Sequence, residues 1–233
     1  MTDETTAGQR LEQVRERIRR ACARVGREPS CVTLVAVSKT CSAGDVAAMH
    51  GAGQVIFGES YVQEALPKMD ALAGLPLRWH FIGRLQKNKA KYITGRFELV
   101  HSLDSIDLAH IMHEKNAALG LRQPVLAQVN LACEAAKAGC SRDEALALAC
   151  AVAGLSGLEL RGLMLMPPWN ADPEANRGLF AQARALKDEL AARLGRKLPE
   201  LSMGMSHDLE QAVEEGATLV RVGTDLFGAR DSR

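Results

Sequence analysis

The stretch Thr33-Leu34-Val35-Ala36-Val37-Ser38-Lys39-Thr40 has the composition of a buried β-strand. Its β-branched and aliphatic residues, bounded by polar ones, are typical of a strand that is covered on both faces, as in parallel sheets. Lys39 stands at the carboxyl end of this strand, where α/β folds place their chemistry. Desolvation there would favour the neutral amine, the nucleophile that forms a Schiff base with an aldehyde. A strand-end lysine that only extends into solvent is the alternative.

Strands and helices alternate on both sides of this stretch. An amphipathic helix is predicted before it, over about 9–25, with Leu11, Val14 and Ile18 on its apolar face. Further strands are predicted at 55–58, 77–82, 98–102, 125–131, 158–166, 201–203 and 217–222, and helices at 42–51, 61–72, 85–93, 104–119, 141–153, 173–194 and from about Ser206. Eight strands that alternate with helices predict a closed (β/α)8 TIM barrel, an α/β fold, with an extra N-terminal helix. An open doubly wound sheet is the alternative, although it normally needs fewer strands.

Length and composition favour a single domain without a global charge. The chain has 233 residues, with 29 Lys+Arg against 28 Asp+Glu, so no net field favours nucleic acid or a membrane surface. We expect a flexible N-terminus at 1–8 and a barrel domain at 9–233. The N-terminus lacks the apolar core of a signal peptide, and no apolar run approaches the ~18 residues of a membrane helix. These features predict a cytoplasmic protein. The six cysteines include no C-x-x-C pair, so we expect no metal site.

The carboxyl ends of the predicted strands supply the candidate ligand site, because this is where barrels of this class bind ligands. The candidates are Lys39, Gly58-Glu59-Ser60, His80 with Gly83, Asn130, Met164 to Pro167, Ser202 to Ser206, and Gly223-Thr224. The loops after strands seven and eight are the usual phosphate cradle of this fold, and here they contain glycines, hydroxyl groups and a predicted helix start near Ser206. Ordinary turns use the same residues, which is the alternative. A lysine that forms an imine and a phosphate cradle across one barrel mouth suggest an aldehyde that carries a phosphate.

Arg221 adds a charged residue near the end of the eighth strand. Strand alternation places it on the same face as Leu219 and Gly223. If that face points into the barrel, Arg221 is a buried cation that must find an acceptor. A structural ion pair with Glu59, or with another carboxylate at the mouth, is the alternative.

Eight segments form longer motifs: Ala36-Val37-Ser38-Lys39-Thr40, Phe57-Gly58-Glu59-Ser60-Tyr61-Val62-Gln63-Glu64, Trp79-His80-Phe81-Ile82-Gly83, Gln86-x-Asn88-Lys89, Arg161-Gly162-Leu163-Met164, Ser202-Met203-Gly204-Met205-Ser206, Val220-Arg221-Val222-Gly223-Thr224 and Phe227-Gly228-Ala229-Arg230. These segments resemble the YggS/PROSC family of pyridoxal phosphate homeostasis proteins. The resemblance covers nearly the whole chain in the right order.

The resemblance implies a barrel related to the N-terminal domain of bacterial alanine racemase, with pyridoxal 5'-phosphate (PLP) held as a Schiff base on Lys39. It implies a phosphate site at Ser202, Gly223 and Thr224, with Ser206 nearby, and a ligand contact at Ser60. We also expect His80 and Met164 close to the cofactor, where His80 either packs against the ring or fills the barrel mouth. It also implies that Arg221 faces the pyridine nitrogen. Because an arginine cannot protonate this nitrogen as a carboxylic acid can, the cofactor becomes a poorer electron sink.

Some positions depart from the family pattern or have an open role. The family usually has asparagine where this chain has Ser60, and an acidic or small residue where it has His207. Lys137 keeps the family's lysine-glycine pair in the loop after strand five; it offers a second, transient phosphate contact or is a solvated loop lysine. Arg84, Lys87, Lys89 and Lys91 similarly either attract anionic ligands or form a solvated face.

The functional prediction is a binding protein that holds, buffers and delivers PLP to PLP-dependent apoenzymes, without catalytic residues of its own and as a monomer. The alternative is a PLP-dependent racemase or another PLP enzyme. Racemisation needs a second acid/base opposite the lysine, and the chain offers only Tyr61 and Tyr92. A third option is an aldolase that uses Lys39 for its own imine, with Glu59 as the nearest carboxylate.

Overall fold

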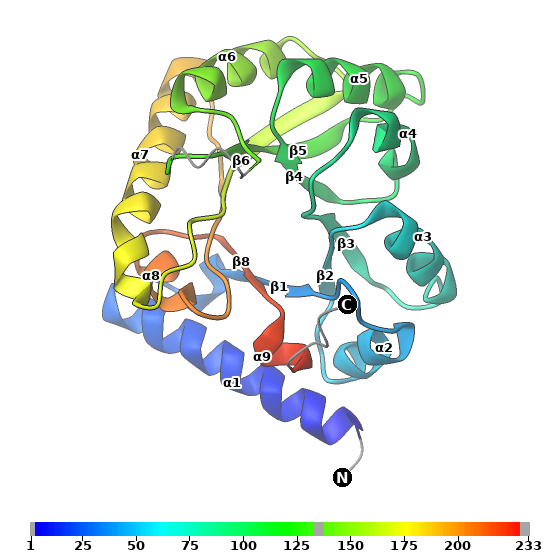
Figure 1. Ribbon diagram of the computed structural model, residues 1–233, viewed down its shortest axis with the longest axis vertical. Helices are drawn as coiled ribbons and strands as arrows, with labels where there is room; N and C mark the ends of the chain where they lie inside the picture. Colours follow the sequence, from blue (N-terminus) through cyan, green and yellow to red (C-terminus); the bar gives the residue numbers. More distant parts are fainter. Residues whose placement is uncertain (1–2, 133–137, 229–233) are drawn as a thin grey trace.

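The computed structural model describes residues 3–132 and 138–228, which form a closed barrel of eight parallel strands in sequential order (Figure 1). The strands are β1 (Thr33–Val37), β2 (Ile56–Glu59), β3 (Arg78–Phe81), β4 (Leu99–Leu103), β5 (Gln123–Val129), β6 (Leu158–Leu165), β7 (Glu200–Ser202) and β8 (Leu219–Val222). β8 pairs with β1, which closes the ring. The predicted (β/α)8 barrel is therefore confirmed.

Helices surround the strands on the outside of the ring (Figure 1). They are α1 (Asp3–Arg24), α2 (Ala43–Gly51), α3 (Val62–Ala71), α4 (Ala90–Ile93), α5 (Ile106–Ala117), α6 (Arg142–Ala153), α7 (Arg177–Leu194), α8 (Leu209–Glu214) and α9 (Thr224–Phe227). The extra helix α1 packs against α2, α8 and α9. Ser42 is the N-cap of α2, since its side chain accepts the backbone N–H of Asp45. No helix in the described ranges is long and apolar enough to cross a bilayer.

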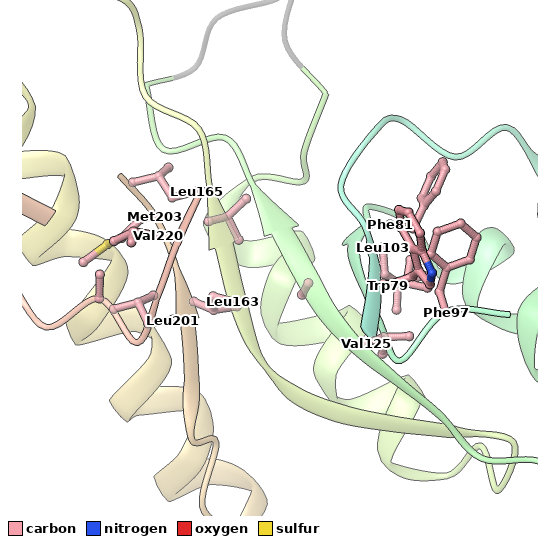
Figure 2. Close-up of a cluster of buried hydrophobic side chains, with 14 of the residues drawn as sticks. Trp79, Phe81, Phe97, Leu103, Val125, Leu163, Leu165, Leu201, Met203 and Val220 are labelled. Carbon is pink, nitrogen blue, oxygen red and sulfur yellow. The ribbon is translucent and has the colours of Figure 1, made fainter. Parts of the chain in front are cut away.

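Strand alternation separates two layers of apolar side chains. A small inner layer contains Val35, Ile56, Leu99, Leu126, Met164 and Leu219. A larger outer layer fills the space between strands and helices. Figure 2 shows part of it, with Trp79, Phe81 and Phe97 on one side and Leu163, Leu201 and Val220 on the other. Strand-end side chains on the same face as the inner layer point into the barrel, and those on the opposite face point toward the helices.

Helix α1 begins at Asp3, so residues 3–8 belong to it, and its residue Ala7 is buried. Two local predictions were wrong. The helix predicted at 85–93 is a 3-10 turn at Lys87–Lys89 followed by the short α4. Helix α8 begins at Leu209 rather than near Ser206, because the Asp208 carboxylate accepts the Met205 N–H (2.8 Å) and closes a turn before the helix. Ser206 is therefore not an N-cap.

Candidate functional site

A cavity of about 590 Å³ opens at the carboxyl ends of β1, β2, β3, β5 and β6. Three predicted site residues line it together: Lys39, Ser60 and Met164. Its other lining residues are Tyr61, Val62, Gln63, Phe81, Ile82, Gly83, Arg84, Gln86, Lys89, Gln128, Ala138 and Met166. No carboxylate from the described residues lines this cavity, whereas Lys39, Arg84 and Lys89 do. An anionic ligand is therefore favoured there.

Glu59 does not face the mouth, contrary to its place among the predicted strand-end candidates. Its side chain is fully buried in the outer layer, where Oε1 accepts the Lys68 Nζ–H (2.7 Å) and the Ser38 Oγ–H (2.7 Å). Desolvation raises the pKa of Glu59, and the hydrogen bonds from Lys68 and Ser38 oppose this shift. Neither an ion pair with Arg221 nor a role as the acid of an aldolase fits this orientation.

Arg221 lies inside the barrel, as strand alternation predicted, and it is 4% exposed. Its Nη1–H donates to Ser202 Oγ (2.6 Å) and its Nη2–H donates to the Leu165 carbonyl (3.0 Å). Ser202 Oγ lies 2.9 Å from His101 Nδ1, and His101 Nε2 lies 3.0 Å from His80 Nδ1. All four of these side chains are buried. The result is one hydrogen-bonded chain across the barrel interior that ends on the Arg221 guanidinium.

Burial sets the charges within this chain. It lowers the pKa of His80 to about 4 and the pKa of His101 well below its usual value, so both imidazoles are neutral at pH 7. Desolvation also lowers the pKa of Arg221, to about 10, and the charge of Asp208 opposes this shift. Arg221 thus stays charged at neutral pH, and its side-chain hydrogen bonds within the described residues go to a hydroxyl and a carbonyl.

His101 was not among the site residues predicted from the sequence. Alternation from Leu99, which belongs to the inner layer, could have placed His101 inside the barrel. The structure places His80 in a lower hollow with Arg78 and Glu98, outside the lining of the mouth cavity. Ser202 is fully buried, and its hydroxyl already contacts Arg221 and His101.

The loops after β7 and β8 meet at one edge of the mouth, next to α1. Arg17 joins them: its Nη2–H donates to the Ser206 carbonyl (2.8 Å) and its Nη1–H donates to Asp225 Oδ2 (2.5 Å). Gly204 has a φ of +88°, and a Cβ there would lie 2.5 Å from the Ala212 side chain, so only glycine fits. Arg17 thereby links the loop of Ser206 to α9, which follows Gly223 and begins at Thr224. Ser202, the other residue of the predicted phosphate site, is buried against Arg221, and none of these four residues lines the mouth cavity.

The predicted basic segment divides into two pairs. Arg84 and Lys89 line the mouth cavity. Lys87 instead pairs with Asp107 (2.7 Å), and Lys91 lies over the Tyr92 ring, 4.9 Å from its centroid. His207 stacks on Trp169, with 6.1 Å between ring centroids. Lys137 falls outside the described residues.

Comparisons with known proteins agree on one family. The family described as "Alanine racemase, N-terminal domain" matches residues 9–231. The chain is similar to a pyridoxal phosphate homeostasis protein of Pseudomonas aeruginosa, with 47% identity over 97% of both chains. It is also similar to one of Aquifex aeolicus, with 44% identity over 96% of this chain and 98% of the other. A solved structure of PipY from Synechococcus elongatus with PLP bound is 38% identical and superposes with a TM-score of 0.85, covering 95% of this chain and all of PipY.

Proposed function

Because the chain belongs to the alanine racemase N-terminal domain family, and within it to the pyridoxal phosphate homeostasis proteins, we propose that it binds PLP as an imine on Lys39. In this proposal the protein holds and buffers PLP in the cytoplasm as a monomer and delivers it to PLP-dependent apoenzymes. PLP supplies an aldehyde for the Lys39 amine, a phosphate for Ser206, Gly223 and Thr224, and a ring nitrogen for Arg221. Ser60 and Met164 contact PLP from the cavity wall. Ser202 and His80 do not contact PLP but belong to the hydrogen-bonded chain that holds Arg221.

Arg221 is the single observation that carries this proposal. A buried guanidinium whose acceptors among the described residues are a hydroxyl and a carbonyl is costly, and an electron-rich ligand atom at the mouth would offset that cost. The unprotonated nitrogen of a pyridine ring is such an atom. A cation at this position does not protonate the nitrogen, so the ring withdraws electrons weakly, which favours storage of the cofactor over catalysis.

Transfer of the cofactor tests the delivery role. Protein loaded with PLP and freed of excess ligand is mixed with a PLP-dependent apoenzyme whose activity reports the arrival of the cofactor. We expect activity to appear faster than with the same total concentration of free PLP in the presence of a PLP trap. A rate no faster than that with free PLP under the same trap would reject direct delivery while leaving binding intact.

A PLP-dependent racemase remains the second candidate, because Tyr61 lines the same cavity as Lys39 and is 55% exposed. A tyrosine at this place could supply the second acid/base that racemisation needs. Exchange of the α-proton of alanine with deuterated water, lost in both Lys39→Ala and Tyr61→Phe, would support the racemase. Absence of exchange in the wild-type protein would support the carrier.

Arg84 and Lys89 should accelerate PLP capture through their charge. In Arg84→Gln/Lys89→Gln, we expect the association rate of PLP at low salt to fall about tenfold, because the cationic lining attracts the anionic ligand. The matched control is Lys87→Gln/Lys91→Gln, which removes two charges from the same segment but outside the cavity. Stopped-flow absorbance gives both rates, and the difference should disappear at about 1 M salt. Equal rates in the two double variants would contradict this steering role.

A further inference from the structure

Lys39 lies in a strained turn. The Cys41 N–H donates to the Ser38 carbonyl (3.0 Å), which closes a tight turn around Lys39 and Thr40. Thr40 has a φ of +64°, the one non-glycine residue with positive φ in the described part of the chain. A β-branched residue rarely adopts this left-handed conformation, which turns usually assign to glycine. Such strain persists only where surrounding contacts impose it, and it concentrates at functional sites.

Contacts from α3 and β2 hold both neighbours of Lys39. Lys68 Nζ donates to the Ser38 carbonyl (2.8 Å), to Glu59 Oε1 (2.7 Å) and to Glu64 Oε1 (3.0 Å). Glu64 Oε1 also accepts the Thr40 backbone N–H. The residue before Lys39 and the residue after it are therefore tied to one ammonium group.

The cluster of Lys68, Glu59 and Glu64 contains buried charges, which cost free energy of folding. The Lys68 side chain is 5% exposed and the Glu59 side chain is fully buried. Glu59 Oε2 has no hydrogen-bond partner among the described residues. A buried ion pair with an unsatisfied oxygen stabilises a fold less than well-packed apolar side chains of the same volume. Its orientation toward the turn gives it a second role, which is to fix the backbone on both sides of the reactive amine.

We propose that Lys68, Glu59 and Glu64 form a positioning clamp that holds the turn Ser38 to Cys41 so that the Lys39 amine faces the mouth cavity. These three are positioning residues, since none of them lines the cavity in which Lys39 lies. The inference rests on the proposed reaction of Lys39 with an aldehyde. It adds that the geometry of this lysine depends on residues on the outer side of the barrel wall.

Glu64→Ala tests the clamp without leaving a buried charge, because the Glu64 side chain is 30% exposed and Lys68 keeps Glu59 and Ser38. Glu64→Gln is the conservative variant, since its amide oxygen can still accept the Thr40 N–H. Asp70→Ala is the matched control on the same helix, where it removes an exposed ion pair with Arg96. Three measurements are made on the full chain: hydrogen exchange of the Thr40 amide, the rate of imine formation with pyridoxal, and the affinity for pyridoxine phosphate.

In Glu64→Ala we expect the Thr40 amide to lose protection and imine formation with pyridoxal to slow about tenfold, because a misplaced nucleophile reacts slowly. Glu64→Gln and Asp70→Ala should stay within about twofold of the wild type. The affinity for pyridoxine phosphate, which lacks the aldehyde, should not change in any variant. This separates positioning of Lys39 from damage to the phosphate site.

Imine formation by Glu64→Ala at the wild-type rate would overturn the clamp. A loss of affinity for pyridoxine phosphate as large as the loss in the rate of imine formation would also overturn it. Failure of the wild-type protein itself to form an imine would reject the proposed function instead. The clamp is then tested without any aldehyde, by the rate at which acetic anhydride acetylates Lys39 in the cofactor-free protein. Equal acetylation rates in wild type and Glu64→Ala would overturn it there too.

Discussion

Lys68→Met is expected to lower the free energy of unfolding by about 3–5 kcal/mol, the largest stability effect that we predict. Lys68 is the only cation paired with the Glu59 carboxylate within the described residues, and that carboxylate is fully buried. Methionine fills a similar volume but leaves Glu59 either as an uncompensated buried charge or as an acid that must take up a proton. Urea denaturation at pH 7.5 measures the loss of unfolding free energy, provided that the wild type and the variant have equal m values.

Two further variants show whether the loss of stability comes from the unpaired Glu59 carboxylate. Lys68→Met/Glu59→Gln should recover more than half of it, because the pair is then removed as a unit. Arg78→Met breaks an ion pair with Glu98 whose partners are 54% and 41% exposed, and it should cost less than about 1 kcal/mol. A loss below about 1 kcal/mol in Lys68→Met would show that Glu59 does not depend on this lysine.

Arg221→Met is expected to weaken PLP binding about 30- to 100-fold. A hydrogen bond from a buried charged donor contributes about 2–3 kcal/mol, which corresponds to this range of affinity. The variant also leaves Ser202 Oγ and the Leu165 carbonyl without the Arg221 donor, so it must be shown to fold. Absorbance titration with PLP measures the affinity, and circular dichroism checks the fold.

An analogue of the cofactor isolates the contact with the ring nitrogen. In 1-deazapyridoxal phosphate a carbon replaces this nitrogen, so wild type and Arg221→Met should bind it within about threefold of each other. Arg161→Met serves as the control. Arg161 is a second arginine of the barrel strands, but it pairs with Glu159 and Glu200 and not with the acceptors of Arg221. An equal loss of affinity for PLP and for the deaza analogue would contradict a contact between Arg221 and the ring nitrogen.

Local sequence patterns were sufficient for the barrel, because eight apolar strands alternate with amphipathic helices. Alternation within one strand also placed Arg221 on the face of Leu219, and the structure shows that this face points into the barrel. The same rule, applied to β2 from Ile56, would have turned Glu59 outward. We instead treated every strand-end residue as facing the mouth, and for this reason the ion pair between Glu59 and Lys68 was not predicted.

Residues that act through distant partners were not predictable in this way. Lys68 lies in the last turn of α3, where a lysine is ordinarily solvated, and its burial depends on a carboxylate from β2. His101 and Ser202 are far apart in the sequence and meet only because β4 and β7 face each other across the barrel. The start of α8 depended on the turn that Asp208 closes, which displaces the helix start that we had expected near Ser206.

The most direct test of the central claim is the absorbance spectrum of purified protein with PLP, recorded before and after borohydride, with Lys39→Ala in parallel. We expect an imine band in the wild-type protein that borohydride converts to a stable adduct, which peptide mass spectrometry locates on Lys39. The Lys39→Ala variant should show neither the band nor the adduct, while it still binds pyridoxine phosphate. An imine band of equal strength in the variant, or an adduct on another lysine, would contradict the account.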